Sequence, residues 1–504
     1  MINHIDMKKN ILLMIIVILL VPSSCSDDLK IIQDNKLTAS NMWQDANDVT
    51  TASNGIYYLI RKNFNSRYTS TFWWGELRVG SYMWGVSHNC DISVTDMTDV
   101  VNNSITSSTS SCCWSALYTA IDQANAVLKY TPEIQMTDAQ SGYALGQAYF
   151  ARAYCYFWAV RLWGDVPLVL KPIESPTQEE TYPSRRSAKD VYAQIESDIA
   201  QAEKYIDYLG TDKYYATPDA VEMLKAEYGL WMYSTQGNEA GYLSSAQSAL
   251  NEIGISGDRL LSDYASVFSR TDKCNEEIIF ALNNDYEDGN TGGYYSTFFQ
   301  LTQEVATQYL SNPVPINGQQ VDFSESFQKM LQDSKDVNHD SRIDCIYGHG
   351  PYGSAGNDIS WVNKFLPQMT VGSSSNIYDC DLIYYRYAQA VIMDAEAKYY
   401  LEDYSGALKS LNILAKRAYG KDDFYTDATK AGVLEALTHE YFIEFAAEGV
   451  IWWALIRLGN LEQYNPDIAK LAKSNENILY WPIYQDALNR NYNLKQTVGW
   501  GSSE

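Results

Sequence analysis

The sequence predicts a mainly α-helical protein in which helix pairs form a scaffold that carries an irregular, loop-rich region. Two observations predict this fold class. Apolar and small residues recur at three- and four-residue steps through much of the chain, as they do on the buried face of a helix. That periodicity is lost between about 258 and 382, where Gly, Asn and Ser are frequent and apolar runs are short. With 504 residues, 46% of them hydrophobic, the chain can bury a large core.

The N-terminus predicts a secretory signal peptide over residues 1–24. Two lysines precede an apolar run over 11–21, which is shorter than the ~20 residues that span a bilayer. Small residues directly before Cys25 resemble a bacterial lipobox, in which the cysteine is diacylated and becomes the first residue of the mature chain. An ordinary signal peptide with an incidental cysteine is the alternative. Ser26-Asp27-Asp28 resembles the acidic tag of lipoproteins that reach the outer face of the outer membrane.

The helix over 137–163 is the most clearly marked one. Thr137 and Gln140 have the spacing of a capping box, and Gly164 and Pro167 end the pattern. Pro218 after Thr217 predicts another helix start. Further helices are expected over about 40–60, 113–130, 383–401, 404–418 and 430–458, and from Ser187.

These helices predict one domain over 25–504. The helical scaffold covers about 40–257 and 383–504, and loop-rich excursions cover about 66–111 and 258–382. Several helix pairs resemble tetratricopeptide pairs, with small residues at the contacts and a short turn between the helices. Since no fixed 34-residue period runs through the chain, generic helical hairpins are the alternative.

Sequence blocks spread over nearly the whole mature chain resemble the SusD/RagB family of outer-membrane nutrient-binding lipoproteins. The blocks run from Ala148 to Tyr154, Trp163 to Leu168, Tyr385 to Ala388, Asp394 to Ala397, Glu444 to Gly449 and Gln496 to Trp500. The resemblance implies a scaffold of four tetratricopeptide-like pairs. It also implies a partner, a SusC-like TonB-dependent barrel over which the lipoprotein acts as a hinged lid. The protein would then be lipid-anchored in the outer membrane and face the outside of the cell.

The resulting hypothesis is a non-enzymatic surface protein that captures an oligosaccharide and delivers it to the transporter. Capture of peptides by the same architecture is the alternative, and a surface glycoside hydrolase has less support because no pair of carboxylates stands out. The net charge of −25 repels phosphate backbones and excludes nucleic acid as a partner. The HExxH and GxSxG motifs are absent, and no cofactor other than calcium is expected.

The family's ligand site is built from loops after the first helix and from the irregular middle. In this chain those segments contain aromatic rings beside polar side chains, which together suit the C–H faces and hydroxyl edges of sugars. Packing of these rings against the helices is the alternative for each of them. The candidate ligand residues are Trp73, Trp74, Arg78, Tyr82, Trp84, Asn89, Tyr294, Tyr295 and Trp361.

A calcium loop is the candidate metal site. The residues Asp336, Asn338, Asp340 and Asp344 place oxygen ligands at alternate positions, as in an EF-hand. A polar turn is the alternative, because Ser341 and Tyr347 replace the expected Gly and Glu. The eight cysteines show no CxxC pair, so zinc is not expected and disulfide pairing stays open.

Overall fold

A computed structural model describes residues 42–64, 69–84, 95–285, 321–352, 357–366, 368–369 and 376–501. The chain divides into two units, Met1–Gln44 and Asp45–Glu504, and the description below concerns the second. Helices dominate it, which confirms the mainly α-helical prediction.

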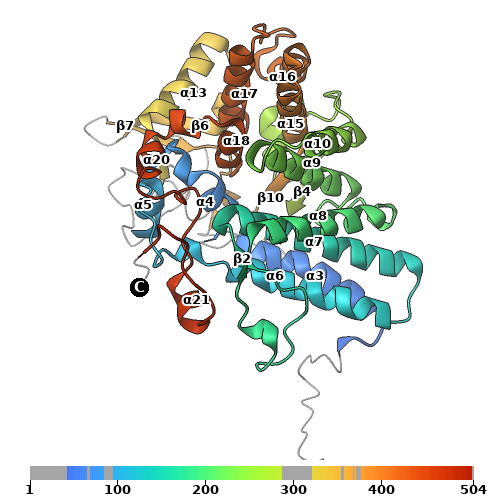
Figure 1. The fold of residues 1–504 in the computed structure, drawn as a ribbon. Coiled ribbons are helices and arrows are strands. Elements are labelled where there is room, and N and C mark those ends of the chain that lie inside the picture. Colours follow the sequence, from blue (N-terminus) through green and yellow to red (C-terminus); the bar gives the residue numbers. More distant parts are fainter. Residues whose placement is uncertain are drawn as a thin grey trace, which may run out of the picture. The chain divides into compact units, whose positions relative to one another are not determined.

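The long helices follow one another as an array in which neighbours along the chain pack as pairs, such as α7 with α8, α9 with α10 and α15 with α16 (Figure 1). The helices of this array are α3 (Ala46–Phe64), α6 (Ser115–Tyr130), α7 (Asp138–Trp163), α8 (Ala188–Lys204), α9 (Pro218–Thr235), α10 (Ala240–Ile253), α15 (Tyr387–Tyr400), α16 (Tyr404–Tyr419), α17 (Lys430–Glu444) and the shorter α18 (Ile451–Leu458). Further helices are α4 (Thr71–Gly75), α5 (Thr95–Val101), α13 (Glu325–Asn338), α14 (Ile343–Ile346), α19 (Leu461–Tyr464), α20 (Pro466–Leu471) and α21 (Gln485–Arg490).

The strands of the described residues form antiparallel pairs. The pairs are β1 (Tyr82–Trp84) with β5 (Val321–Phe323), β2 (Val166–Pro167) with β3 (Arg185–Arg186), β4 (Ile278–Leu282) with β10 (Leu382–Arg386), β6 (Tyr347–Tyr352) with β7 (Asn357–Val362), and β8 (Gln368–Met369) with β9 (Asn376–Ile377). The β4–β10 pair places Ile278 opposite Arg386 and joins the start of the loop-rich middle to its end.

The helices have the local features that the sequence predicts. The capping box of α7 forms, with Thr137 and Gln140 each bonded to the other's backbone N–H. Helices α9 and α10 approach closely at Gly229, where a Cβ atom would lie 2.6 Å from the carbonyl oxygen of Tyr242. Small residues at such a contact allow the tight packing of a helical hairpin.

The predicted helix over 430–458 is wrong in one respect, because the chain breaks between α17 and α18. Ala447 and Gly449 adopt positive φ angles of 68° and 77°, which a helix does not allow. The buried carboxylate of Glu76 accepts hydrogen bonds of 2.6 Å from both N–H groups. The break therefore results from a contact with a residue far away in the sequence, which helical periodicity does not reveal.

The first excursion is ordered where the structure describes it, and it packs into the core. Helix α4 carries Trp73 and Trp74, whose side chains have no exposed surface. The Trp74 ring lies 5.5 Å from the ring of Phe64 and 5.9 Å from that of Trp158, and its Nε1 donates to the carbonyl oxygen of Ser111 at 2.9 Å. These rings fasten the excursion to α3 and α7.

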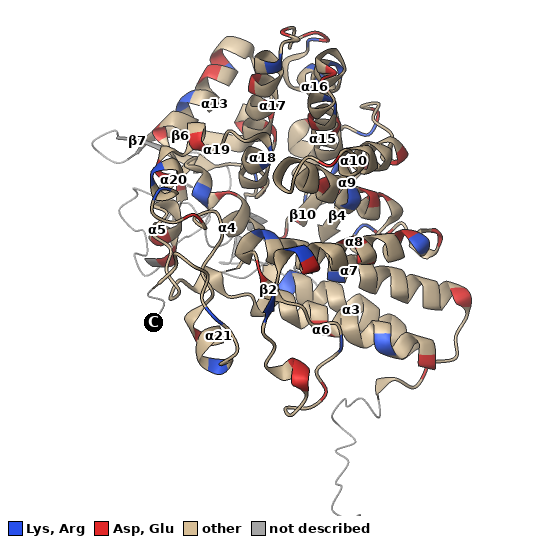
Figure 2. Ribbon diagram, in the orientation of Figure 1, with Lys and Arg blue, Asp and Glu red and all other residues tan. Residues whose placement is uncertain are grey.

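Nine charged side chains form a buried cluster, called here the Glu444 network. Its members come from the loop-rich middle, from β10, from α16 and α17, and from the turn after α17, and none is more than 4% exposed at its side chain. Figure 2 shows charged positions of both signs on the ribbon of α16 and α17, where part of the network lies. The cations are Arg342, Lys364, Arg386 and Arg417, and the anions are Glu277, Asp340, Glu440, Glu444 and Glu448.

Glu444 is the shared anion of this network. Its carboxylate pairs with Arg386 at 2.7 Å, with Arg342 at 2.8 Å and also with Arg417. Burial alone would raise the pKa of Glu444, but the three guanidinium groups hold that pKa well below its usual range. The glutamate is therefore ionised at neutral pH.

We predict that Glu444→Gln lowers the free energy of unfolding by about 3–5 kcal/mol, because it leaves three buried guanidinium groups with too little negative charge. Chemical denaturation in urea measures the loss. The matched control is Asp333→Asn, which removes a 2.6 Å pair with Lys329 on the exposed face of α13 and should cost less than about 1 kcal/mol. Equal effects of the two variants would contradict a structural role for the network.

We also predict that Trp74→Ala destabilises the fold by about 3–5 kcal/mol, since it removes a large ring from a packed core. Thermal unfolding checks this, with Tyr58→Ala on α3 as the control because the Tyr58 side chain is 53% exposed. A Trp74→Ala variant as stable as the parent would show that the ring does not anchor the excursion.

Candidate functional site

A polar pocket with a volume of about 640 Å³ opens on the loop-rich side of the scaffold. Its wall combines the 3₁₀ turn Tyr264–Phe268 and the residues after it with α14, the segment after β7 and the segment before β10. The lining residues are Asp263, Ala265, Ser266, Phe268, Ser269, Arg270, Thr271, Ser341, Asp344, Cys345, Asn363, Lys364, Leu366 and Cys380.

The wall of this pocket is held by bonds to the scaffold. Lys364 donates to Glu448 at 2.8 Å and to the carbonyl oxygen of Ala446 at 2.7 Å, so a member of the Glu444 network also lines the pocket. Burial lowers the pKa of Lys364, while the neighbouring Glu448 opposes that shift. The ammonium group is thus fully engaged within the protein and fixes the position of the pocket wall.

The remaining polar groups give the pocket both donors and acceptors. Arg270 forms an ion pair with Asp379 at its edge. Asn363 donates from Nδ2 to the carbonyl oxygen of Asp344 at 2.8 Å, and it accepts from Trp361 Nε1 at 3.2 Å. Oriented polar groups of this kind suit a ligand that carries several hydroxyl groups. Sequence reasoning missed Asp263, Arg270 and Asn363 because isolated polar residues in loops follow no spacing rule.

Four of the predicted ligand residues lie in the core. Trp73, Trp74 and Arg78 have no exposed surface and Tyr82 is 2% exposed, so none offers a ring face or a donor to a ligand in this conformation. Their predicted role at the surface is therefore corrected to one in packing. The alternative that these rings pack the loops against the helices, which the sequence left open, is what the structure has.

Arg78 illustrates why the sequence pattern misled. Its Nη2 donates to the carbonyl oxygen of Ile478 at 2.6 Å and its Nε to Asn103 Oδ1 at 3.1 Å, while the guanidinium carbon lies 4.7 Å from the ring centroid of Trp452. Burial lowers the pKa of Arg78 to about 9. An arginine among aromatic residues looks the same in a sequence whether it faces a ligand or the core.

The other predicted ligand residues are placed as follows. Trp361 in β7 is 4% exposed and its ring covers Gly348 of β6, so it packs the hairpin. The backbone of Trp84 ends β1 opposite Val321. Asn89, Tyr294 and Tyr295 lie outside the described residues, and their role in ligand binding stays a prediction.

A second buried carboxylate lies beside these aromatic residues. Glu76 accepts from Tyr82 Oη at 2.5 Å as well as from the two backbone N–H groups between α17 and α18. Burial raises the pKa of Glu76 to about 7, because the desolvation of the carboxylate outweighs the three hydrogen bonds, which lower the pKa. This carboxylate joins the first excursion to the C-terminal helices.

The predicted calcium loop does not form. Asp340 is buried, and the Arg342 guanidinium binds both of its oxygens, from Nε at 2.9 Å and from Nη2 at 2.8 Å. Asp336 and Asn338 both belong to α13, where residues two apart point to different sides of the helix. Asp344 pairs with Lys335 at 2.6 Å instead. In the described part of the chain, no three His, Cys, Asp or Glu side chains cluster as a metal ion would require.

Two further findings concern the cysteines and the membrane. The described cysteines, which are Cys112, Cys113, Cys155, Cys274, Cys345 and Cys380, are all free thiols. Among the residues described, none of the helices combines the length and the apolar character needed to cross a bilayer.

Comparison with known proteins gives two family matches and one relative over the full chain. Residues 347–500 match the model described as "SusD family", and residues 72–221 match the one described as "Starch-binding associating with outer membrane". "SusD-like protein P38" of Formosa agariphila is 25% identical over 98% of this chain and 100% of its own length.

Solved structures agree with these matches. "B. fragilis NanU" superposes with a TM-score of 0.77 and 26% identity, covering 93% of this chain and all of its own. A structure described as "Laminarin binding SusD-like protein" has a TM-score of 0.74 at 19% identity, covers 91% of this chain and all of its own, and thus shares the fold. The matched family models, the full-length relative and the common fold thus agree that the chain is similar to proteins of the SusD family over most of its length.

Proposed function

We propose that this protein captures an oligosaccharide at the outer surface of the cell and delivers it to a SusC-like TonB-dependent transporter. The observation that carries the proposal is the match of residues 72–221 to the model described as "Starch-binding associating with outer membrane". The laminarin-binding protein, which shares this fold, is consistent with a carbohydrate ligand.

The polar pocket supports the same proposal. Its volume of about 640 Å³ lies in the range of small-molecule sites, and its lining is rich in hydroxyl, amide and charged groups. We assign Arg270 the role of a donor to sugar hydroxyls, because its Nε is the atom paired with Asp379 and the rest of the guanidinium has further N–H groups. The protein would bind and release the sugar without changing it.

The transporter and the lipid anchor belong to the proposal as well. A lid that binds sugar at its loop-rich face hands the ligand to the barrel beneath it when the two close. The anchor at Cys25 would keep the lid beside the barrel. Capture of peptides remains the second candidate function, because the acidic chain would attract basic peptides by its net charge of −25.

A glycan array followed by calorimetry on the purified mature protein tests the function. We expect binding to one class of oligosaccharide, with no release of reducing sugar on long incubation. Arg270→Met should weaken binding at least tenfold, since a hydrogen bond from a charged donor contributes about 1.5–3 kcal/mol. The matched control is Arg259→Met, which breaks a 2.7 Å pair with Asp219 outside this pocket and should leave binding unchanged.

Each other outcome of this experiment has a definite meaning. Binding of peptides in place of glycans would overturn the carbohydrate proposal in favour of peptide capture. Release of reducing sugar would identify a hydrolase. Tight glycan binding that Arg270→Met leaves unchanged would keep the function and reject this pocket as the site.

We predict that Cys25→Ala releases the protein from the membrane. Burying an acyl chain contributes about 0.8 kcal/mol per CH₂ group, and several chains are needed for stable anchoring. The measurement is the distribution of the variant between soluble and outer-membrane fractions in cells that lack the transporter. A variant that stays in the membrane fraction of those cells would refute acylation of this cysteine as the anchor.

A further inference from the structure

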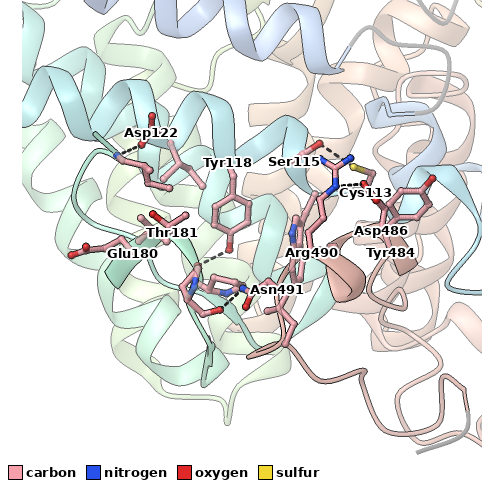
Figure 3. A pocket seen from close by; sticks show the side chains of 18 residues that line it. Cys113, Ser115, Tyr118, Asp122, Glu180, Thr181, Tyr484, Asp486, Arg490 and Asn491 are labelled. Atoms are coloured by element: carbon pink, nitrogen blue, oxygen red, sulfur yellow. Dashed lines mark hydrogen bonds and ion pairs between the residues drawn. The ribbon is translucent and has the colours of Figure 1, made fainter. Parts of the chain in front are cut away.

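A cleft separate from the polar pocket lies where the start of α6, the segment 167–183 and α21 meet. Its volume is about 300 Å³. Figure 3 shows Tyr118 at its centre, with Asp122, Glu180 and Thr181 toward one end and Cys113, Ser115, Asp486 and Arg490 toward the other. None of these residues belongs to the predicted ligand site or to the polar pocket.

The floor of the cleft is apolar. It is made by side chains that are buried in the protein, namely Trp114, Ile121, Pro167, Val169 and Leu494. The polar groups that reach the floor are already bonded within the protein. Tyr118 Oη donates to the carbonyl oxygen of Pro167 at 2.5 Å, and Asn491 Nδ2 donates to that of Pro183 at 2.8 Å. A hydroxyl group placed on this floor would lose its hydration and gain little in return.

The rim of the cleft is polar and mainly acidic. Asp122 accepts the backbone N–H of Ile173 at 2.7 Å through Oδ1 only, so its second oxygen can accept from a ligand. Asp486 and Arg490 pair at 3.0 Å on the exposed side of α21, and Glu180 pairs with Lys171 at 3.1 Å. Tyr118 and Tyr484 add aromatic rings to the lining. The cleft therefore suits a ring with one apolar side and hydroxyl groups along the opposite edge.

We propose that this cleft is a second carbohydrate site, which takes a single 6-deoxyhexose residue with its methyl group on the apolar floor. The inference rests on the proposed function, because it assumes a carbohydrate ligand. A volume of about 300 Å³ is at the lower limit of ligand pockets and admits one ring, while a chain of sugars would have to continue outside it. Carboxylates along the rim favour a ligand with several hydroxyl donors over the aromatic side chain of a peptide, which has at most one.

Two matched sugars test the choice of ligand. Methyl α-L-fucopyranoside and methyl α-L-galactopyranoside differ only in the hydroxyl group at carbon 6. Calorimetry should show the fucoside binding at least tenfold more tightly, because the galactoside places that hydroxyl on the apolar floor. Equal affinity of the two sugars would overturn the proposed orientation and with it the 6-deoxyhexose assignment.

Two variants on α21 test the place. Ala487 lines the cleft and Asn489 does not, so Ala487→Phe should fill the cavity and abolish fucoside binding, whereas Asn489→Phe should leave it unchanged. Fucoside binding that Ala487→Phe leaves intact would overturn the site.

A measurement on the parent protein does not depend on how the Ala487→Phe variant folds. Cys113 is a free thiol at the rim of the cleft, so bound fucoside should slow its alkylation by N-ethylmaleimide. Peptide mass mapping measures the rate at this cysteine. An unchanged rate would reject the site.

The outcomes separate this inference from the proposed function. If oligosaccharides bind and respond to Arg270→Met while the fucoside does not bind, the function stands and the second site is wrong. If no carbohydrate of any kind binds, both proposals fail. Protection of Cys113 by a phenylalanine-containing peptide and not by the fucoside would assign the cleft to peptides and overturn the carbohydrate assignment.

Discussion

The sharing of Glu444 among three arginines fixes how the loop-rich middle of the chain joins the helical scaffold. Glu444 ends α17, while Arg342 follows α13, Arg386 ends β10 and Arg417 lies in α16. Removing these charges from water is costly, and only complete pairing offsets that cost. A middle segment docked in another position would leave a buried charge without a partner. Charge pairing therefore selects one docking position, which apolar contacts alone do not specify so sharply.

The Glu444 network also holds one wall of the polar pocket in place. Lys364 contributes to its wall and also pairs with Glu448, so the wall cannot shift without disturbing the network. The exposed groups around the pocket have no such constraint. A scaffold of this kind allows the side chains that face a ligand to vary while their positions in space stay the same, so that one fold can serve different ligands.

The helices could be predicted from the sequence because their signals are local. The capping box at Thr137 and the periodic apolar residues of α7 need no information from the rest of the chain. The break between α17 and α18 could not be predicted, because it depends on Glu76, which is distant in sequence. The burial of the Trp74 ring could not be predicted for the same reason. Whether Trp74 faces a ligand or Trp158 is decided by tertiary packing, and the composition of the excursion is the same in both cases.

The contacts that close the structure join residues far apart in the chain, and this sets the order of folding. Arg78 bonds to the backbone of Ile478, and the backbone N–H of Trp481 bonds to Leu162. A chain that emerges from its N-terminus cannot form these contacts until nearly all of it has appeared. Closing such long loops is slow, because their entropy is lost before the contacts form. For the export that we propose, this delay has a use, since a chain that cannot yet fold passes more readily through a narrow channel.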